Sequence, residues 1–260
     1  MTSYQGGKSK LGKDIYEVII SFEAFILDKI GYNKNKILPY FEPFIGMGGV
    51  MKHFSLNQDP DNYRTLLASD ANPDLILLWK ELQKGWIPPI KCPSKTVYHE
   101  LKKSSTHSAL KGYIGITCSF GGIFFGGYRS KKSQKRPDYN YVKSCSKTLQ
   151  HLGILMRNVE FLNPRSYDKF YPTNSLIYCD PPYLGNTYQQ VTSYFKFDHD
   201  KFWELMRQWS KKNIVIISEY SAPEDFVCIW RKKFTFGFHK NGEKHKKCNE
   251  CLFVHRTYFN

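Results

Sequence analysis

A short apolar run that ends in an acid, two prolines and a tyrosine constrains this chain more than any other stretch. Residues 175–178 have the composition of a buried strand, and Asp180-Pro181-Pro182-Tyr183 follows closely. Each proline fixes its φ angle and lacks an amide donor, so the strand must end here in a stiff loop. The strand end carries a carboxylate, carbonyl oxygens and an aromatic ring, which together could hold a planar group bearing an NH2. A plain strand followed by a Pro-Pro turn is the alternative.

A glycine turn and a second strand-end acid precede this segment. Residues 37–45 favour a strand, Gly46-Met47-Gly48-Gly49 follows, and a helix is expected over residues 50–54. Strand, glycine turn and helix is the arrangement by which Rossmann-like folds hold nucleotide-like cofactors, because glycine lets a ligand approach the backbone.

Asp70 ends the next predicted strand, residues 65–70, about 20 residues beyond the glycine turn. At that spacing an acid can accept hydrogen bonds from both ribose hydroxyls. The alternative role is an N-cap for the helix that starts after Pro73, but Asn72 can serve there and leave Asp70 free for a ligand.

The amino-terminal stretch Tyr4-Gln5-Gly6-Gly7-Lys8 leads into a helical pattern over residues 15–26. Backbone amides in a glycine loop beside a lysine form a natural anion site. A flexible terminal turn is the plainer interpretation.

Charge and cysteine usage limit the class of protein. Lys and Arg total 38 against 23 Asp and Glu, a formal net charge of +15, and 16% of residues are aromatic. Such a surplus favours a polyanionic partner, nucleic acid first, although a basic but inert surface is the alternative. Seven dispersed cysteines fit a reducing compartment. The polar residues 1–13 do not resemble a signal peptide, and the uncharged run 113–128 is broken by glycines. We therefore expect a soluble intracellular protein.

Residues 85–158 break the α/β alternation and are predicted to form an insertion. They contain a linker-like stretch at 86–90, a weakly helical stretch at 98–110, and a glycine- and aromatic-rich stretch at 119–128. A basic run follows, whose cations could hold phosphates while neighbouring aromatic rings wedge between bases or stack on them. A solvated charged face is the alternative. The candidate DNA-binding residues are Arg129, Lys131, Lys132, Lys135 and Arg136.

The remaining chain predicts strands over 159–163 and 213–218, a helix over 199–211, and closing strands over 226–229, 234–238 and 252–255. Cys248-x-x-Cys251 has no second cysteine pair, so no metal site is predicted.

Taken together, four blocks in this order resemble the D12 class, or Dam-like, family of DNA adenine-N6 methyltransferases. They are residues 4–8, 41–49, 68–73 and 180–183. The resemblance implies an α/β, Rossmann-like S-adenosyl-L-methionine-dependent methyltransferase fold. It implies a catalytic domain over 1–84 and 159–260, and a mainly helical DNA-recognition insertion over 85–158 that carries a hairpin or loop.

The resemblance also assigns roles. It places Lys8 near the cofactor carboxylate, Asp70 on the ribose and Tyr167 beside the cofactor adenine, although Ser166 stands where the family often has an acid. The implied cofactor-binding residues are Tyr4, Lys8, Glu42, Phe44, Gly46, Gly48, Asp70, Tyr167 and Asp180, and the implied catalytic residues are Asp180, Pro181, Pro182 and Tyr183.

The implied reaction needs an adenine that is flipped out of double-stranded DNA. Tyr183 would stack on this base, while the Asp180 carboxylate and the Pro181 carbonyl accept hydrogen bonds from its exocyclic amine. Direct transfer then needs no metal and no covalent enzyme intermediate, and a monomer or weak dimer suffices. A catalytically idle DNA-binding relative, an RNA adenine methyltransferase of the same fold and a non-enzymatic basic protein remain as alternatives. The recognition sequence stays open, with the family's frequent GATC as one candidate.

Overall fold

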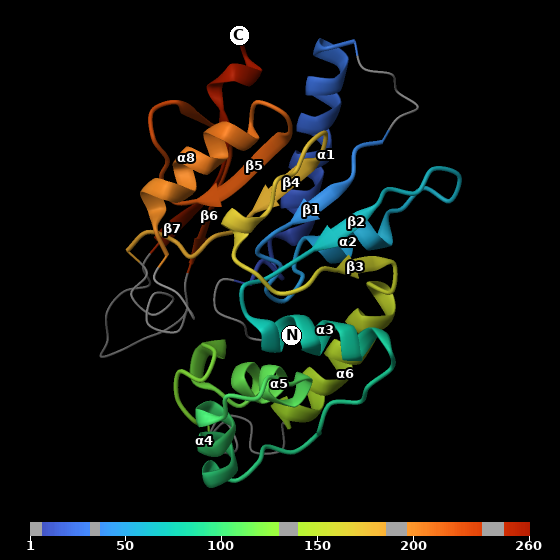
Figure 1. Cartoon of the computed structure of the whole chain (residues 1–260), viewed down its shortest axis with the longest axis vertical. Coiled ribbons are helices and arrows are strands. Elements are labelled where there is room, and N and C mark those ends of the chain that lie inside the picture. Colours follow the sequence, from blue (N-terminus) through green and yellow to red (C-terminus); the bar gives the residue numbers. More distant parts are fainter. Residues whose placement is uncertain (1–6, 32–36, 130–139, 186–196, 236–246) are drawn as a thin grey trace.

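A seven-stranded sheet organises the fold in the order β3-β2-β1-β4-β5-β7-β6 (Figure 1). The computed structural model describes residues 7–31, 37–129, 140–185, 197–235 and 247–260. Strands β1 to β5 pair in parallel, whereas β7 is antiparallel to both β5 and β6. This confirms the expected mixed α/β class. The strands are β1 (Tyr40–Glu42), β2 (Leu66–Ala68), β3 (Val159–Phe161), β4 (Leu176–Cys179), β5 (Ile214–Glu219), β6 (Phe226–Thr235) and β7 (Lys247–His255).

Side chains alternate between the two faces of the sheet along each strand, and both faces carry buried apolar residues, so both faces are covered. On β4, Ile177 and Cys179 pack with Phe202 and Met206 of α8. The opposite face carries Tyr178 and belongs to a larger core with α1, α2 and α3. The helices are α1 (Gly12–Lys29), α2 (Met51–Leu56), α3 (Pro73–Gln83), α4 (Lys95–Lys103), α5 (Ala109–Thr117), α6 (Tyr141–Leu155) and α8 (His199–Trp209), with 3-10 turns η1 (Phe120–Gly122), η2 (Tyr167–Lys169) and η3 (Arg256–Tyr258). None of the helices described is both long and apolar enough to cross a membrane.

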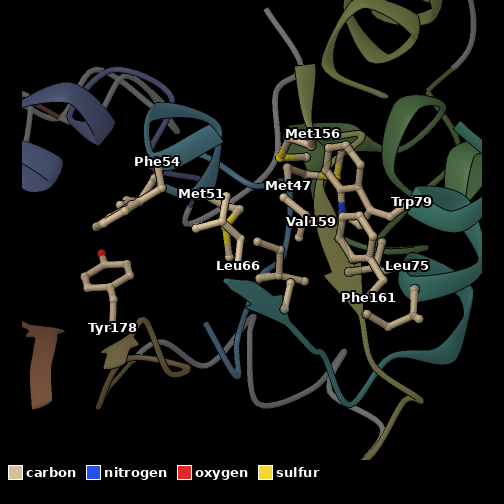
Figure 2. Close-up of a cluster of buried hydrophobic side chains, with 14 of the residues drawn as sticks. Met47, Met51, Phe54, Leu66, Leu75, Trp79, Met156, Val159, Phe161 and Tyr178 are labelled. Carbon is tan, nitrogen blue, oxygen red and sulfur yellow. The ribbon is translucent and has the colours of Figure 1, made fainter. Parts of the chain in front are cut away.

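Figure 2 shows how the larger core joins the sheet to the helices. Met51 of α2 lies near Leu66 of β2, and Phe54 of α2 lies toward Tyr178 of β4. Trp79 of α3 stacks on Phe161 of β3 with ring centroids 5.6 Å apart and the planes nearly parallel. These contacts fix α2 and α3 against one face of the sheet.

Helices α4 and α5 lie on the far side of α3 from the sheet, and α6 returns the chain to β3 (Figure 1). The buried carboxylate of Asp74, in the first turn of α3, links α3 to the start of α5. It accepts hydrogen bonds from the Ser108 amide (2.8 Å) and from His107 Nδ1 (3.2 Å), and Lys111 Nζ lies 3.7 Å away. A β-carbon at Gly112 would stand 2.3 Å from the Asp74 carbonyl oxygen, so α5 packs directly on the α3 backbone.

Several predicted boundaries were wrong. The helical stretch expected over 98–110 is two helices, because α4 ends at Lys103 and Ser108 caps α5 by accepting from the Lys111 amide. The strands expected at 226–229 and 234–238 belong, as far as Thr235, to the single strand β6, which has an irregularity between Cys228 and Trp230. The helix after Pro73 and its Asn72 cap are confirmed, since Asn72 Oδ1 accepts from the Asp74 amide.

Candidate active site

Four acids lie at or next to the carboxyl ends of neighbouring strands. Glu42 ends β1, Asp70 follows β2, Asp180 follows β4, and Glu219 ends β5. Because these strands are adjacent and parallel, their carboxyl ends meet at one edge of the sheet, where open α/β folds bind ligands. The edge therefore brings together Glu42, Asp70 and Asp180, which the resemblance implied for the site, and one further carboxyl group, that of Glu219.

Lys8 connects the glycine turn to the acid of the Asp180-Pro-Pro-Tyr segment. Its backbone packs so closely on Gly49 that a β-carbon there would stand 2.9 Å from the Lys8 carbonyl carbon. Its ammonium lies 2.7 Å from Asp180 Oδ1, 3.6 Å from a carboxylate oxygen of Glu250, and 4.6 Å from the ring centroid of Tyr183. Burial alone would lower the pKa of Lys8, but the charges of Asp180 and Glu250 raise it above its ordinary value. Lys8 is therefore a permanent buried cation in the site.

Asp70 braces the glycine turn. One carboxylate oxygen accepts the Gly46 amide at 3.1 Å and the other accepts the Asn72 amide at 2.9 Å. Burial raises the pKa of Asp70 to about 6, against the lowering effect of these two hydrogen bonds. Gly48 has φ +62°, a left-handed backbone conformation that favours glycine at this position.

Two carboxyl groups at this edge of the sheet, those of Asp180 and Glu42, are hard to ionise. Burial raises the pKa of Asp180 to about 6, with Lys8 opposing the shift and Glu250 adding to it. Burial likewise raises the pKa of Glu42 to about 8, although the Tyr40 hydroxyl donates to Glu42 at 2.7 Å and lowers it. Such groups gain from any further positive charge placed beside them.

Tyr183 is turned inward. Its hydroxyl lies 2.8 Å from Ser218 Oγ and also donates to Glu250, which accepts from Ser218 as well. The ring of Tyr220 meets that of Tyr183 edge-on, with centroids 4.6 Å apart. The side chain is buried to 5% exposure, which places the phenol edge inside the protein.

Glu219 holds the loop after Tyr183 in place. Its two carboxylate oxygens accept the amides of Leu184 (2.7 Å) and Tyr220 (2.6 Å). Burial raises the pKa of Glu219 to about 7, and the two amide hydrogen bonds lower it. The apolar run before Glu219 marked it as a strand-end residue, whereas nothing in the sequence pointed to Ser218 or Glu250.

Phe44 and Tyr167, which the resemblance implies as cofactor-binding residues, lie side by side. Their ring centroids are 5.2 Å apart, and Phe197 lies 5.4 Å from Tyr167. Tyr167 is on η2, which directly follows Ser166.

The other predicted site residues fall into two groups. Arg129 is described: its guanidinium carbon lies 4.0 Å from the ring centroid of Tyr141, and its amide donates to the Cys118 carbonyl. Phe120, on η1 nearby in the chain, is 60% exposed. Tyr4, Lys131, Lys132, Lys135 and Arg136 lie outside the described residues.

Residues 4–113 match the D12 class N6 adenine-specific DNA methyltransferase family. The matched range is less than half of the chain. It includes Lys8, the glycine turn and Asp70 and ends inside α5, whereas Asp180 and Tyr183 lie beyond it. No curated protein matches the chain.

Proposed function

Taking the D12 class match over residues 4–113 as the premise, we propose that this protein is a DNA adenine methyltransferase. It transfers a methyl group from S-adenosyl-L-methionine to N6 of an adenine in double-stranded DNA. The observation that supports this most directly is the contact between the two halves of the site. Lys8, packed on the glycine turn, reaches Asp180 Oδ1 at 2.7 Å and so joins the matched region to the Asp180-Pro-Pro-Tyr segment.

The residues present fit the cofactor, which supplies the reactive methyl group when bound. Its sulfonium and ammonium charges suit the carboxyl groups of Glu42 and Asp180, because burial raises their pKa values and a further positive charge beside them would favour the ionised form. Asp70 uses one acceptor position on each oxygen for the backbone, so further positions remain for ribose hydroxyls. Phe44 would line the methionine part of the cofactor, and the neighbouring ring of Tyr167 would lie beside its adenine. The proposed cofactor-binding residues are Tyr4, Lys8, Glu42, Phe44, Gly46, Gly48, Asp70, Tyr167 and Asp180.

Asp180 and Pro181 are proposed to hold the target amine. The amine would donate one hydrogen bond to the Asp180 carboxylate and one to the Pro181 carbonyl, which would orient its nitrogen for methylation. The amine loses one proton after the methyl group has been transferred. Pro182 stiffens the loop, and Tyr183 provides the ring on which the flipped base stacks. The rate then comes from positioning and electrostatics, since no group of the protein has to form a covalent bond.

Residues 85–158 are proposed as the DNA-recognition insertion within a catalytic domain formed by 1–84 and 159–260. Phosphates would be held by Arg129, Lys131, Lys132, Lys135 and Arg136, which lie in a chain of net charge +15. The backbone of Phe120, whose ring is exposed, is paired with the segment that leads to Arg129, because the Phe120 amide donates to the Gly127 carbonyl and Ser119 pairs with Tyr128. An exposed ring beside cations is the combination that inserts between bases.

Transfer of a labelled methyl group from S-adenosyl-L-methionine to duplex DNA tests the proposal. The wild-type chain is expected to label adenine N6. Asp180→Asn removes the negative charge of the carboxylate that accepts the hydrogen bond from the amine. We expect at least a hundredfold loss of turnover, with the affinity for DNA within about threefold of the wild-type value. Asp225→Asn is the matched control, since Asp225 is bonded to Arg207 and His255. An Asp180→Asn variant with near wild-type turnover would contradict the catalytic assignment.

A further inference from the structure

Glu250 is a buried carboxylate at the same edge of the sheet as Asp180, and the reaction as proposed above does not use it. It lies on β7, the strand inserted between β5 and β6, and only 1% of it is exposed. In the sequence it is the second of two residues between Cys248 and Cys251. Its place in the site comes from the pairing of β7 with β5, in which Ser218 is opposite Leu252.

The contacts of Glu250 converge on the target-base side of the site. Both the Tyr183 hydroxyl and the Ser218 hydroxyl donate to Glu250 Oε1, and these two hydroxyl oxygens lie 2.8 Å apart. Lys8 Nζ lies 3.6 Å from the same carboxylate oxygen. Glu250 therefore contacts the ring proposed to stack on the base and the cation that is paired with Asp180.

A carboxylate in this position restricts both neighbours. An ionised carboxylate only accepts hydrogen bonds, so both hydroxyl hydrogens are directed toward it. Breaking either bond would leave a buried charge undersatisfied, which costs more than an ordinary hydrogen bond gains. The phenol edge of Tyr183 is thereby tied to the sheet, and the Lys8 ammonium is held between two carboxylates.

We propose that Glu250 is a positioning residue of the target-base pocket, an inference that rests on the proposed function. Through the Tyr183 hydroxyl it fixes the plane of the ring on which the base stacks. Through Lys8 it changes the electrostatic potential at the Asp180 carboxylate. It does not touch the base itself.

Methylation kinetics with Glu250→Gln test this role, because glutamine keeps the size and one acceptor oxygen but loses the charge. We expect kcat to fall about tenfold or more, the loss typical of a buried hydrogen bond to a charged group, with KM for the cofactor within about twofold. With 2-aminopurine at the target position, we expect stronger fluorescence in the complex, since the flipped base stacks less firmly on Tyr183.

Two further readouts separate positioning from a purely structural role. In a Tyr183→Phe background, Glu250→Gln should lower kcat by no more than about threefold, because the hydroxyl through which Glu250 acts is already gone. The acid limb of the pH–rate profile should also move to lower pH. Burial raises the pKa of Asp180 most, Glu250 raises it further, and Lys8 and Tyr183 lower it. Glu42 and Glu219 also interact electrostatically with Asp180, and both are unchanged in this variant.

Glu23→Gln is the matched control. Glu23 is 5% exposed and paired with Arg64 at 2.7 Å, so this change also removes a buried carboxylate from an ion pair. It should lower the melting temperature and leave kcat, the pH limb and the 2-aminopurine signal unchanged. A wild-type chain that methylates no adenine overturns the proposed function and this inference with it. An active wild-type chain with full kcat and an unmoved pH limb in Glu250→Gln overturns the positioning role alone.

Discussion

At the scale of single residues, Lys8 controls the ionisation of the proposed catalytic acid. Its ammonium is 7% exposed and lies 2.7 Å from Asp180 Oδ1. Burial raises the pKa of Asp180 to about 6, and the Lys8 charge is the largest influence that lowers it. Asp180 can accept the hydrogen bond from the amine at either of its oxygens only when it is ionised. Because Lys8 lowers the pKa of Asp180, it determines what fraction of the enzyme can bind the amine in this way near neutral pH.

We predict that kcat/KM falls below about pH 6, approaching a tenfold loss for each further pH unit, as Asp180 takes up a proton. Lys8→Met removes the charge that lowers the pKa of Asp180, so the acid limb should move to higher pH. A pH–rate profile of both proteins measures this. Lys10→Met, at an exposed position two residues away, should leave the limb where it is. An acid limb that stays in place in Lys8→Met would show that Lys8 does not act on Asp180.

At the scale of elements, the turn after α5 presents an aromatic ring to solvent. The antiparallel bridge between Ser119 and Tyr128 closes this turn, and Phe120 stands on it at 60% exposure. The turn is anchored beneath by buried groups: the Tyr98 hydroxyl meets Ser119 Oγ at 2.7 Å, and the Phe125 amide donates to the Gly115 carbonyl. A rigid base under an exposed apolar ring is expected of a contact surface rather than of a core.

We predict that Phe120→Ala weakens binding to duplex DNA by about tenfold, the loss expected when one stacking or wedging ring is removed. The melting temperature should change by less than about 2 °C, because the ring is mostly in solvent. Fluorescence anisotropy with a labelled duplex measures the affinity. Tyr63→Ala is the control, since Tyr63 is 68% exposed on the approach to β2. Equal affinities of Phe120→Ala and wild type would exclude the turn from the DNA interface.

At the scale of the whole molecule, the buried acids of the site lower the free energy of unfolding as the pH rises. Glu42, Asp70, Asp180 and Glu219 all have pKa values raised mainly by burial, to between about 6 and about 8. Between about pH 4 and pH 8 the folded state holds protons on these groups that the unfolded state has lost. Their contribution to stability is therefore complete at low pH and is lost as the pH rises through the folded pKa values. His53 and His199, whose pKa values burial lowers, act in the opposite sense near pH 6.

We predict that Glu42→Gln stabilises the protein at pH 8 and has much less effect at pH 5. Each unit of pKa shift corresponds to about 1.4 kcal/mol, and the pKa of Glu42 is raised to about 8. The amide of glutamine still accepts the Tyr40 hydroxyl bond. Urea unfolding of both proteins at the two pH values measures the difference. A variant with the same free energy of unfolding as wild type at both pH values would show that Glu42 is not buried as a proton-holding acid.

The parts of the site that could be predicted from the sequence are those set by local chemistry. A glycine turn after a strand and a proline pair after another mark strand ends wherever they occur, so Gly48, Asp70 and Asp180 could be placed from their neighbours alone. Glu250 could not, because it enters the site only through the pairing of β7 with β5, between segments far apart in the chain. The helical lobe beyond α3, formed by α4, α5 and α6, was only partly predicted. The break between α4 and α5 depends on Ser108 and on the buried Asp74, contacts that a periodicity pattern does not contain.

On the proposed function, the position of Asp74 limits how a protein of this architecture can acquire a new target sequence. Asp74 follows Asp70 by four residues, and its buried carboxylate requires Ser108 and Lys111 from the lobe beyond α3. A lobe transplanted from a relative would have to bring partners for that carboxylate, since a buried charge without them is costly. On the proposed function, exchange of specificity is then easiest for the turn that carries Phe120. The first turn of α5 would be inherited together with the proposed cofactor-binding residues that precede it.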